Sequence, residues 1–239
     1  MVVLAGIDLA WSGRNPTGLC ALEVADDALT LREVDCGVRT AGELADWLEG
    51  LGEEVVAAID APLIATPLRR AEAEMARVYG RQGVFAYAAR PAFLEAKGIA
   101  EGPRLGTLLV RRGWSLDPGD IGKRPRVAIE VFPHAIAVAL LGAERIIRYK
   151  KGRLAARSEA LELFRSLLHG HASFEPLAAC PELAANVAAV TGRALKDRED
   201  RLDAIACALA AYHGWRYGLD VSEVFGDATN GYIAVPRRR

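Results

Sequence analysis

Two short apolar segments of this chain each end in a single aspartate. Residues 2–7 run directly into Asp8, and residues 55–59 run directly into Asp60. An apolar run of this length without polar alternation is typical of a strand that is covered on both faces of an α/β sheet. A carboxylate at the end of such a strand is costly to bury unless it meets a cation or hydrogen-bond donors. Alternatively, each aspartate does no more than begin the turn that follows its strand.

The two aspartates would act together if their strands were neighbours. A helix expected over residues 40–52 separates residues 55–59 from the preceding strands, which favours a parallel crossover. Parallel neighbours would bring Asp8 and Asp60 out at the same edge of the sheet. Since ligands in open α/β sheets bind at that carboxyl edge, the pair predicts a polar site there.

A third carboxylate, Glu130, interrupts the apolar residues 127–132 of another expected strand. Two interpretations fit this position. Glu130 joins an acidic group with the aspartates, or it pairs with a neighbouring arginine such as Arg126. We favour the first and keep the second open. His134 follows at a strand-to-helix turn, where a lone histidine is typical of a hydrogen-bonded structural residue.

Two more acids lie in an Ala-rich segment that predicts a long helix ending near residue 217. Asp200 and Asp203 are three positions apart, so their side chains share one helix face. The same face continues through Ala204 and Cys207, whose small side chains would let the helix approach the sheet closely. The helix would then direct both carboxylates toward the strand ends. A solvated acidic first turn is the alternative, and it explains Asp197 and Glu199 well but Asp203 less well.

The spacing of apolar runs, turn residues and caps predicts a single α/β domain over residues 1–239. We expect a five-stranded mixed sheet in which strands 1–3 form an antiparallel meander and strands 4 and 5 run parallel to strand 1. Helices flank the sheet, and a basic, mostly helical insertion separates strands 4 and 5. The expected strands cover residues 2–8, 17–24, 29–36, 55–60 and 127–132, the insertion covers about 61–125 with a basic helix over 68–81, and the tail forms a short edge strand over 231–236.

Charge is segregated along the chain although the net charge is only -1. Residues 1–60 contain 3 Lys or Arg and 12 Asp or Glu, whereas residues 61–160 contain 18 Lys or Arg and 9 Asp or Glu. If the basic residues gather on one face, they would bind a polyanion. Solvated helix faces are the equally simple alternative.

Aromatic residues are interleaved with the basic residues of the insertion. Phe85, Tyr87 and Phe93 lie close in sequence to Arg81 and Arg90. Such rings could stack on nucleic-acid bases. Aromatic side chains in an apolar setting usually pack in the core, however, and we expect core packing for these three.

Apolar runs, the N-terminal sequence and the cysteine spacing also bear on the cellular location of the protein. No apolar run approaches the roughly 20 residues that cross a bilayer, and the N-terminus lacks the features of a signal peptide. The 4 cysteines are scattered without the spacing of a zinc site or a disulfide framework. We therefore expect a cytoplasmic protein that binds no membrane. The sequence leaves the oligomeric state open.

Four motifs carry the acids in order along the chain: Gly6-Ile7-Asp8-Leu9-Ala10-Trp11, Ile59-Asp60-Ala61-Pro62, Glu130-Val131-Phe132-Pro133-His134 and Asp200-Arg201-Leu202-Asp203-Ala204. Their order resembles the RNase H-like fold, which carries carboxylates on its first strand, at its fourth strand and on a C-terminal helix. More narrowly, the motifs resemble those of the domain of unknown function 429 family, predicted nucleases of this fold. The resemblance covers nearly the whole chain.

This resemblance implies metal-dependent nuclease chemistry. Carboxylates that converge on one edge raise one another's pKa unless cations neutralise them, and oxygen ligands suit Mg²⁺ or Mn²⁺. Two such ions, about 3.5–4 Å apart, could activate water and stabilise the leaving oxygen of a phosphodiester. We expect Asp8 and Asp203 to be primary ligands, Asp60 to be a bridging or second ligand, and Glu130 and Asp200 to be further ligands or a base.

The expected substrate is a nucleic acid or a nucleotide, and its phosphates need cationic partners. The residues that we expect to bind these phosphates are Arg69, Arg77, Arg81, Lys150 and Lys196.

Two other functions remain open. The first is a nucleotide-binding phosphotransferase or ATPase of the actin-like superfamily, whose members share this topology but duplicate the domain and place a Gly-rich loop after strand 1. Here Gly13 is the only glycine in the loop at residues 11–14, and we find no Walker-type loop. The second is a non-catalytic binding domain, since fold alone does not settle function.

Overall fold

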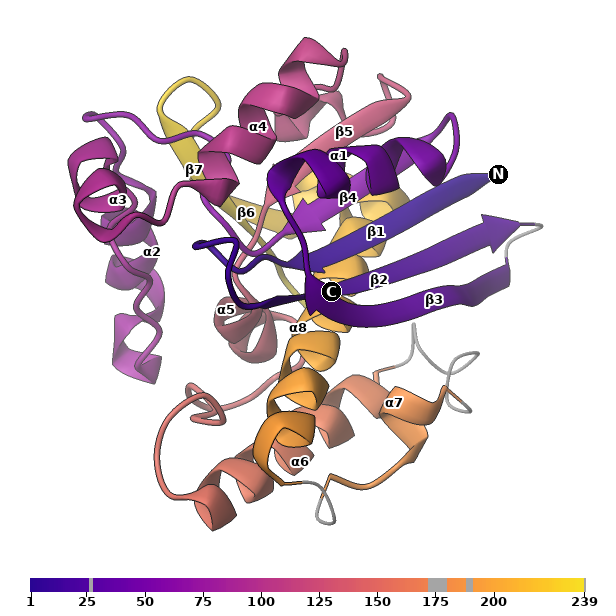
Figure 1. Cartoon of the computed structure of the whole chain (residues 1–239), viewed down its shortest axis with the longest axis vertical. Helices are drawn as coiled ribbons and strands as arrows, with labels where there is room; N and C mark the ends of the chain where they lie inside the picture. The colour runs from indigo at the N-terminus through magenta and orange to yellow at the C-terminus, as the bar shows by residue number, and fades with distance from the viewer. Residues whose placement is uncertain (26–27, 172–179, 188–190, 239) are drawn as a thin grey trace.

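A five-stranded mixed sheet forms the centre of the computed structural model, which describes residues 1–25, 28–171, 180–187 and 191–238 (Figure 1). The strand order is β3-β2-β1-β4-β5. β1 pairs antiparallel with β2 and parallel with β4, and β4 pairs parallel with β5. This confirms the expected RNase H-like arrangement of the sheet. The strands are β1 (Val2–Asp8), β2 (Pro16–Ala25), β3 (Ala28–Val38), β4 (Val55–Ile59) and β5 (Arg126–Glu130).

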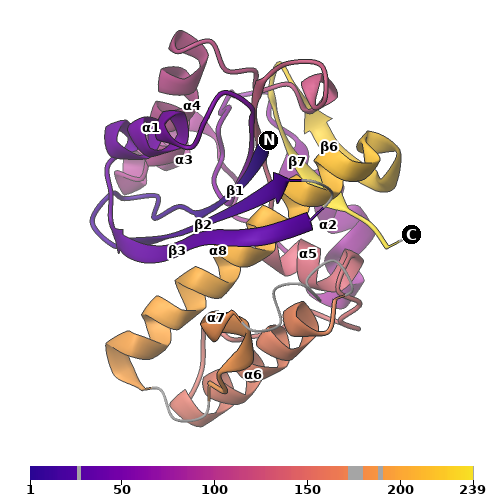
Figure 2. The same cartoon turned by 90° about the vertical axis from the view of Figure 1, so that its right-hand side faces the viewer.

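Helices cover both faces of this sheet. Figure 2 shows α1 (Ala41–Gly50) and α4 (Glu101–Arg111) on one side and α8 (Gly192–Tyr217) on the other. α1 begins at a capping box in which the Thr40 hydroxyl accepts from Glu43 N while the Glu43 side chain accepts from Thr40 N. The buried leucines of α1 and α4 pack against the apolar side chains of β1 and β4 that face them. Burial on both faces explains why β1 and β4 read as continuous apolar runs.

The helix α8 approaches the sheet very closely because two strand residues have no side chain. A Cβ atom on Gly6 would lie 2.0 Å from the Ala204 carbonyl oxygen, and one on Gly18 would lie 2.0 Å from the Asp200 carbonyl oxygen. Any larger residue would therefore force the helix away from β1 and β2. α5 (Pro133–Ala139) and α6 (Leu154–His169) complete the core on this face.

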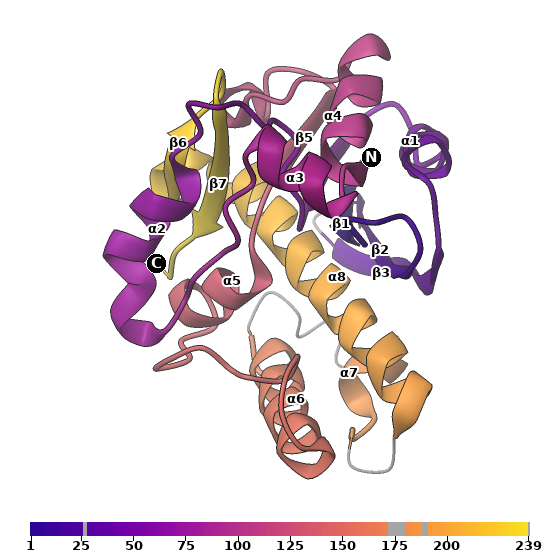
Figure 3. The same ribbon diagram turned by 60° about the vertical axis from the view of Figure 1, so that its left-hand side comes forward.

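A second, two-stranded sheet lies beside the main one. Its strands β6 (Ser222–Asp227) and β7 (Gly231–Pro236) pair antiparallel and pack against α2 (Ala71–Tyr79), as Figure 3 shows. The tail strand exists as expected, but it pairs with β6 and not with an edge of the main sheet. The remaining described helices include α3 (Pro91–Lys97) and the short α7 (Pro181–Ala184). In the described ranges, none of the helices is both long and apolar enough to cross a membrane.

Candidate functional site

The parallel strands β1 and β4 place Asp8 and Asp60 at one edge of the sheet. Asp8 is the last residue of β1, and Asp60 directly follows β4. The Asp60 backbone N–H donates to the Ile7 carbonyl, 2.8 Å away, so the strand pairing continues up to the acids. The loop after β1 is held in place by the buried Thr17, whose hydroxyl accepts from Ala10 N. This is the geometry that the two matching apolar runs predicted.

The helix α8 brings Asp200 and Asp203 to the same edge. Both aspartates are buried, and the Asp203 side chain is completely inaccessible to solvent. The close approach of α8 at Gly6 and Gly18 sets their position, since these glycines contact the helix backbone at Ala204 and Asp200. The small-residue face that the sequence indicated is therefore the face that packs on the sheet.

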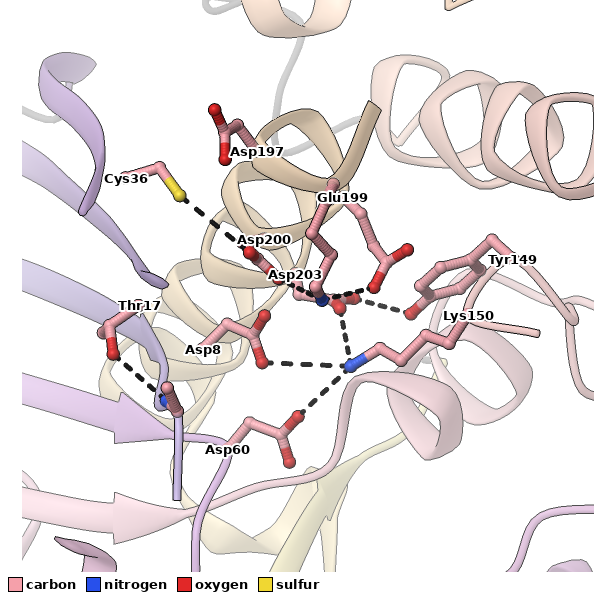
Figure 4. A network of polar contacts seen from close by, with 12 residues as sticks. Asp8, Thr17, Cys36, Asp60, Tyr149, Lys150, Asp197, Glu199, Asp200 and Asp203 are labelled. Atoms are coloured by element: carbon pink, nitrogen blue, oxygen red, sulfur yellow. Dashed lines mark hydrogen bonds and ion pairs between the residues drawn. The ribbon is translucent and has the colours of Figure 1, made fainter. Parts of the chain in front are cut away.

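The ammonium group of Lys150 lies among three of these carboxylates. Its Nζ atom is 2.8 Å from Asp203 Oδ2 and 3.8 Å from both Asp8 Oδ1 and Asp60 Oδ2, as Figure 4 shows. The neighbouring Tyr149 hydroxyl donates to Asp203 Oδ1 over 2.6 Å. Three acids from three separate elements thus share one cation, which offsets part of the cost of burying them.

Asp200 belongs to a second part of the same network. Lys196 Nζ lies 2.6 Å from Asp200 Oδ1 and 2.6 Å from Glu199 Oε1. Arg157 adds an ion pair to Glu199 at 3.3 Å, and the Cys36 thiol lies 3.9 Å from Asp200 Oδ2. Asp200 is therefore compensated by a different cation from the one that compensates Asp203.

Burial dominates the protonation of this cluster. It raises the pKa of Asp60, and the neighbouring Asp8 and Asp203 carboxylates add to the effect while Lys150 opposes it. Burial also raises the pKa of Asp203 to about 6 and that of Asp200 to about 8, with Lys150 and Lys196 respectively opposing the rise. Burial alone would favour the neutral amine of Lys150, but the carboxylates outweigh it and raise its pKa. A divalent cation bound here would favour the ionised carboxylates and would oppose the rise in their pKa.

Glu130 does not share this cation. Both of its oxygens accept from Arg69, Nη2 to Oε1 over 2.5 Å and Nη1 to Oε2 over 3.0 Å, and Leu63 N also donates to Oε2. Burial raises the pKa of Glu130 to about 7 although Arg69 opposes the rise. The second interpretation of the sequence, an ion pair with an arginine, thus describes the observed contacts, but the partner is Arg69 and not Arg126.

The five basic residues that we expected to bind phosphate fall into three groups. Arg69 is completely buried and donates to Glu130, Glu72 and the Ile64 carbonyl, so it has no surface to offer a substrate. Arg77 and Arg81 are exposed but do not line the cavity described below. Lys150 and Lys196 do line it.

A cavity of about 1060 Å³ opens beside the acidic cluster. Asp8, Asp60 and Asp200 contribute to its wall, and so do several side chains of the insertion and of the basic segment before α6. Phe85 and Tyr87 line it with 64% and 65% of their surface exposed. The expectation that these two rings pack in the core is therefore wrong, while Phe93 is half-buried.

The roles of several site residues were not identified from the sequence. Tyr149 carried no signal of its own, Lys150 was expected to bind phosphate and not to neutralise the acids, and His134 was interpreted as a structural residue. His134 lines the cavity and packs against the rings of Phe132 and Tyr149, with centroid distances of 5.5 and 4.9 Å. Burial and the nearby Lys150 lower the pKa of His134 to about 3, so it stays neutral at ordinary pH.

The donor set suits a hard divalent cation, because it consists of carboxylate oxygens. Asp203 Oδ2 is buried and lies 2.8 Å from Lys150 Nζ. Within the described part of the chain, no three acidic, histidine or cysteine side chains are arranged around a common metal position. The Lys150 ammonium lies between the oxygens that such an ion would use.

Two comparisons with known proteins bear on this site. No curated protein matches the chain. A family model described as "Protein of unknown function (DUF429)" matches residues 6–219. This range includes the site residues Asp8, Asp60, Glu130, Lys150, Asp200 and Asp203. The chain belongs to the DUF429 family.

Proposed function

We propose that this protein is a metal-dependent nuclease that hydrolyses phosphodiester bonds with two bound Mg²⁺ or Mn²⁺ ions. The observation that carries the proposal is the convergence of Asp8, Asp60 and Asp203 within 3.8 Å of one ammonium group. Buried acids are rare because they are costly, and such clusters are typical of functional sites. An isolated structural ion pair would need only one of these acids.

Asp8, Asp60 and Asp203 would hold the ions, with Asp200 as a further ligand or base. The metal would supply a water of lowered pKa and would stabilise the charge on the leaving oxygen. Lys150 compensates the acids in the absence of metal, so a divalent ion must compete with its ammonium for the same oxygens. Glu130 is left outside this proposal, because Arg69 and Leu63 already occupy its oxygens.

Nucleotide-dependent phosphotransfer has less support. The loop that follows β1 would have to present its backbone amides to a phosphate. Instead, Gly13 N donates to the Ala10 carbonyl and Arg14 N donates to the Ser12 hydroxyl. Both amides therefore already donate hydrogen bonds within the loop and do not point to a phosphate.

A cleavage assay tests the proposal. Labelled single-stranded, duplex, RNA–DNA hybrid and branched substrates are incubated with Mg²⁺ or Mn²⁺. We expect cleavage that falls at least about 100-fold in Asp8→Asn, since a ligand carboxylate supplies several kcal/mol of transition-state stabilisation through its ion. Asp46→Asn, which removes a carboxylate that is 69% exposed on α1, is the matched control and should cleave like the unmodified protein. Cleavage that survives Asp8→Asn would place the chemistry elsewhere.

A further inference from the structure

Two aromatic rings are held at the surface of the cavity by their own neighbours in the chain. In the segment between the η1 turn (Gly80–Gln82) and α3, Val84 and Ala89 are completely buried and anchor the backbone. Phe85 and Tyr87 both lie between these two anchors in sequence and are exposed. Exposed aromatic rings are costly in water, so this arrangement calls for a partner that covers them.

Each ring also has a neighbour that restricts its orientation. A Cβ atom on Gly80 would lie 3.3 Å from Cε1 and Cζ of Phe85, so the Phe85 ring lies directly over that glycine. Lys151 Nζ lies 3.2 Å from the Tyr87 hydroxyl and 5.7 Å from the centre of its ring. A ring that is already positioned loses little entropy when a flat ligand stacks on it.

Exposed cations line the same cavity as these rings. Lys97, Arg148 and Lys151 are exposed and line it together with Phe85 and Tyr87. Among the residues that the structure describes, neither Lys97 nor Arg148 forms an ion pair with an acid. Their charge is therefore available to an anion. Aromatic faces combined with unpaired cations are the features of surfaces that bind single-stranded nucleic acid.

We infer that this wall binds single-stranded DNA or RNA, with unpaired bases stacked on Phe85 and Tyr87 and with phosphates near Lys97, Arg148 and Lys151. The inference rests on the proposed function in one respect: it assigns the scissile phosphate to the acidic end of the same cavity. Bases in a duplex are stacked on their neighbours and cannot offer a free face to a protein ring. The cavity volume of about 1060 Å³ is at the upper end of single-ligand pockets, so it can hold more than one nucleotide.

Binding measured by fluorescence anisotropy tests the inference without any need for cleavage. The probes are 12-nucleotide single strands of DNA and of RNA, the blunt DNA duplex of the same sequence, and a mononucleotide competitor, all in EDTA at low salt. We expect either single strand to bind at least about fivefold more tightly than the duplex. Phe85→Ala and Tyr87→Ala should each weaken that binding about fivefold or more, because one stacked base is lost.

Two control variants separate stacking from other effects. Tyr87→Phe keeps the ring but loses the hydroxyl that contacts Lys151, so it should bind single strands more tightly than Tyr87→Ala. Leu163→Ala removes an apolar side chain of α6 that is 53% exposed outside the cavity and should have no effect. Equal affinity for duplex and single strand, full binding by both alanine variants, or a mononucleotide that binds as tightly as the oligomers would each overturn the inference.

The outcomes of the two proposals are distinguishable. Ring-dependent binding of single strands without hydrolysis in Mg²⁺ or Mn²⁺ would overturn the nuclease proposal alone. Hydrolysis that depends on Asp8, with unchanged affinity in Phe85→Ala and Tyr87→Ala, would overturn the single-strand inference alone.

Discussion

Lys150 is the residue on which the charge balance of the acidic cluster depends. Its ammonium is the cation shared by Asp8, Asp60 and Asp203, and 30% of its side-chain surface is exposed to solvent. Lys150 extends from a segment without helix or strand, between α5 and α6. Displacement of the Lys150 side chain would therefore not require the movement of a helix or strand that carries it.

Removing the Lys150 charge should lower the stability of the protein and increase the stabilisation that Mn²⁺ provides. In Lys150→Met, three acids lose their shared cation, so we expect the free energy of unfolding at pH 8 in EDTA to fall by more than about 1 kcal/mol. Saturating Mn²⁺ should then raise the melting temperature of the variant more than that of the unmodified protein, because no ammonium competes with the ion.

Lys151→Met is the matched control for this experiment. Lys151 is the next residue, is exposed and contacts Tyr87 instead of the acids. Its variant should respond to Mn²⁺ like the unmodified protein. An equal Mn²⁺ response in Lys150→Met and Lys151→Met would show that Lys150 and the metal do not share ligands.

Asp200 should make the folded protein less stable as the pH rises. Its pKa is raised from 3.8 to about 8 in the folded state, so the folded protein binds this proton more tightly than the unfolded chain. The contribution of Asp200 to stability is complete below about pH 4 and is lost as the pH approaches 8.

The variant Asp200→Asn lacks that titration. Its free energy of unfolding, relative to that of the unmodified protein, should therefore increase between pH 4 and pH 8 by more than about 1 kcal/mol. Urea denaturation in EDTA across this pH range measures the difference, with Asp46→Asn as the exposed control. Curves for Asp200→Asn and the unmodified protein that run parallel would contradict the raised pKa.

At the scale of elements, the distance between α8 and the sheet sets the position of Asp200 and Asp203. Gly6 and Gly18 allow that distance, and the Gly6 position would place a Cβ atom 2.3 Å from Ala208 N as well as 2.0 Å from the Ala204 carbonyl oxygen. Both clashing atoms belong to the helix backbone, which cannot relieve the clash by a change of rotamer as a side chain can. The whole helix would have to move.

Gly6→Ala should consequently damage the site as well as the fold. We expect a loss of about 1–3 kcal/mol in stability from overpacking, and a smaller Mn²⁺-induced rise in melting temperature because Asp203 moves with the helix. Gly37→Ala is the matched control, since Gly37 also lies in a strand but has nothing within 4 Å of its Cβ position. Normal stability and a normal Mn²⁺ response in Gly6→Ala would refute this explanation of the packing.

The elements that hold the acids could be predicted from local patterns. The apolar runs before Asp8 and Asp60 favour burial on both faces, and the small residues around Asp203 favour close packing, so each pattern indicates its element from local sequence. β6 was missed because its residues alternate too weakly to show a buried face. Its partner is β7, and the pair packs on α2, which is far away in sequence.

The partners of the buried acids could not be predicted in the same way. A long arginine or lysine side chain reaches several positions, and nothing local distinguishes Arg69 from Arg126 as the partner of Glu130. The same holds for Lys150 among the cations that surround it in sequence. Phe85 and Tyr87 were assigned to the core because their segment is apolar, whereas Val84 and Ala89 fill the core there and leave the rings outside.

At the scale of the molecule, the fold brings the acidic and basic parts of the chain together. The carboxylates come mainly from the first strands and from α8, whereas the cations and exposed rings of the cavity come mostly from the insertion and the segment before α6. Charges that cancel in the net total are therefore adjacent in space. One end of the cavity suits a cation, and the adjoining wall suits a polyanion.

The most direct test of this account is the position of Mn²⁺ in crystals soaked with the metal, located by anomalous diffraction. We expect manganese bound by oxygens of Asp8, Asp60 and Asp203, with the Lys150 ammonium displaced from its position 2.8 Å from Asp203 Oδ2. Crystals in which Lys150 still joins the three carboxylates and no manganese lies among them would contradict the account.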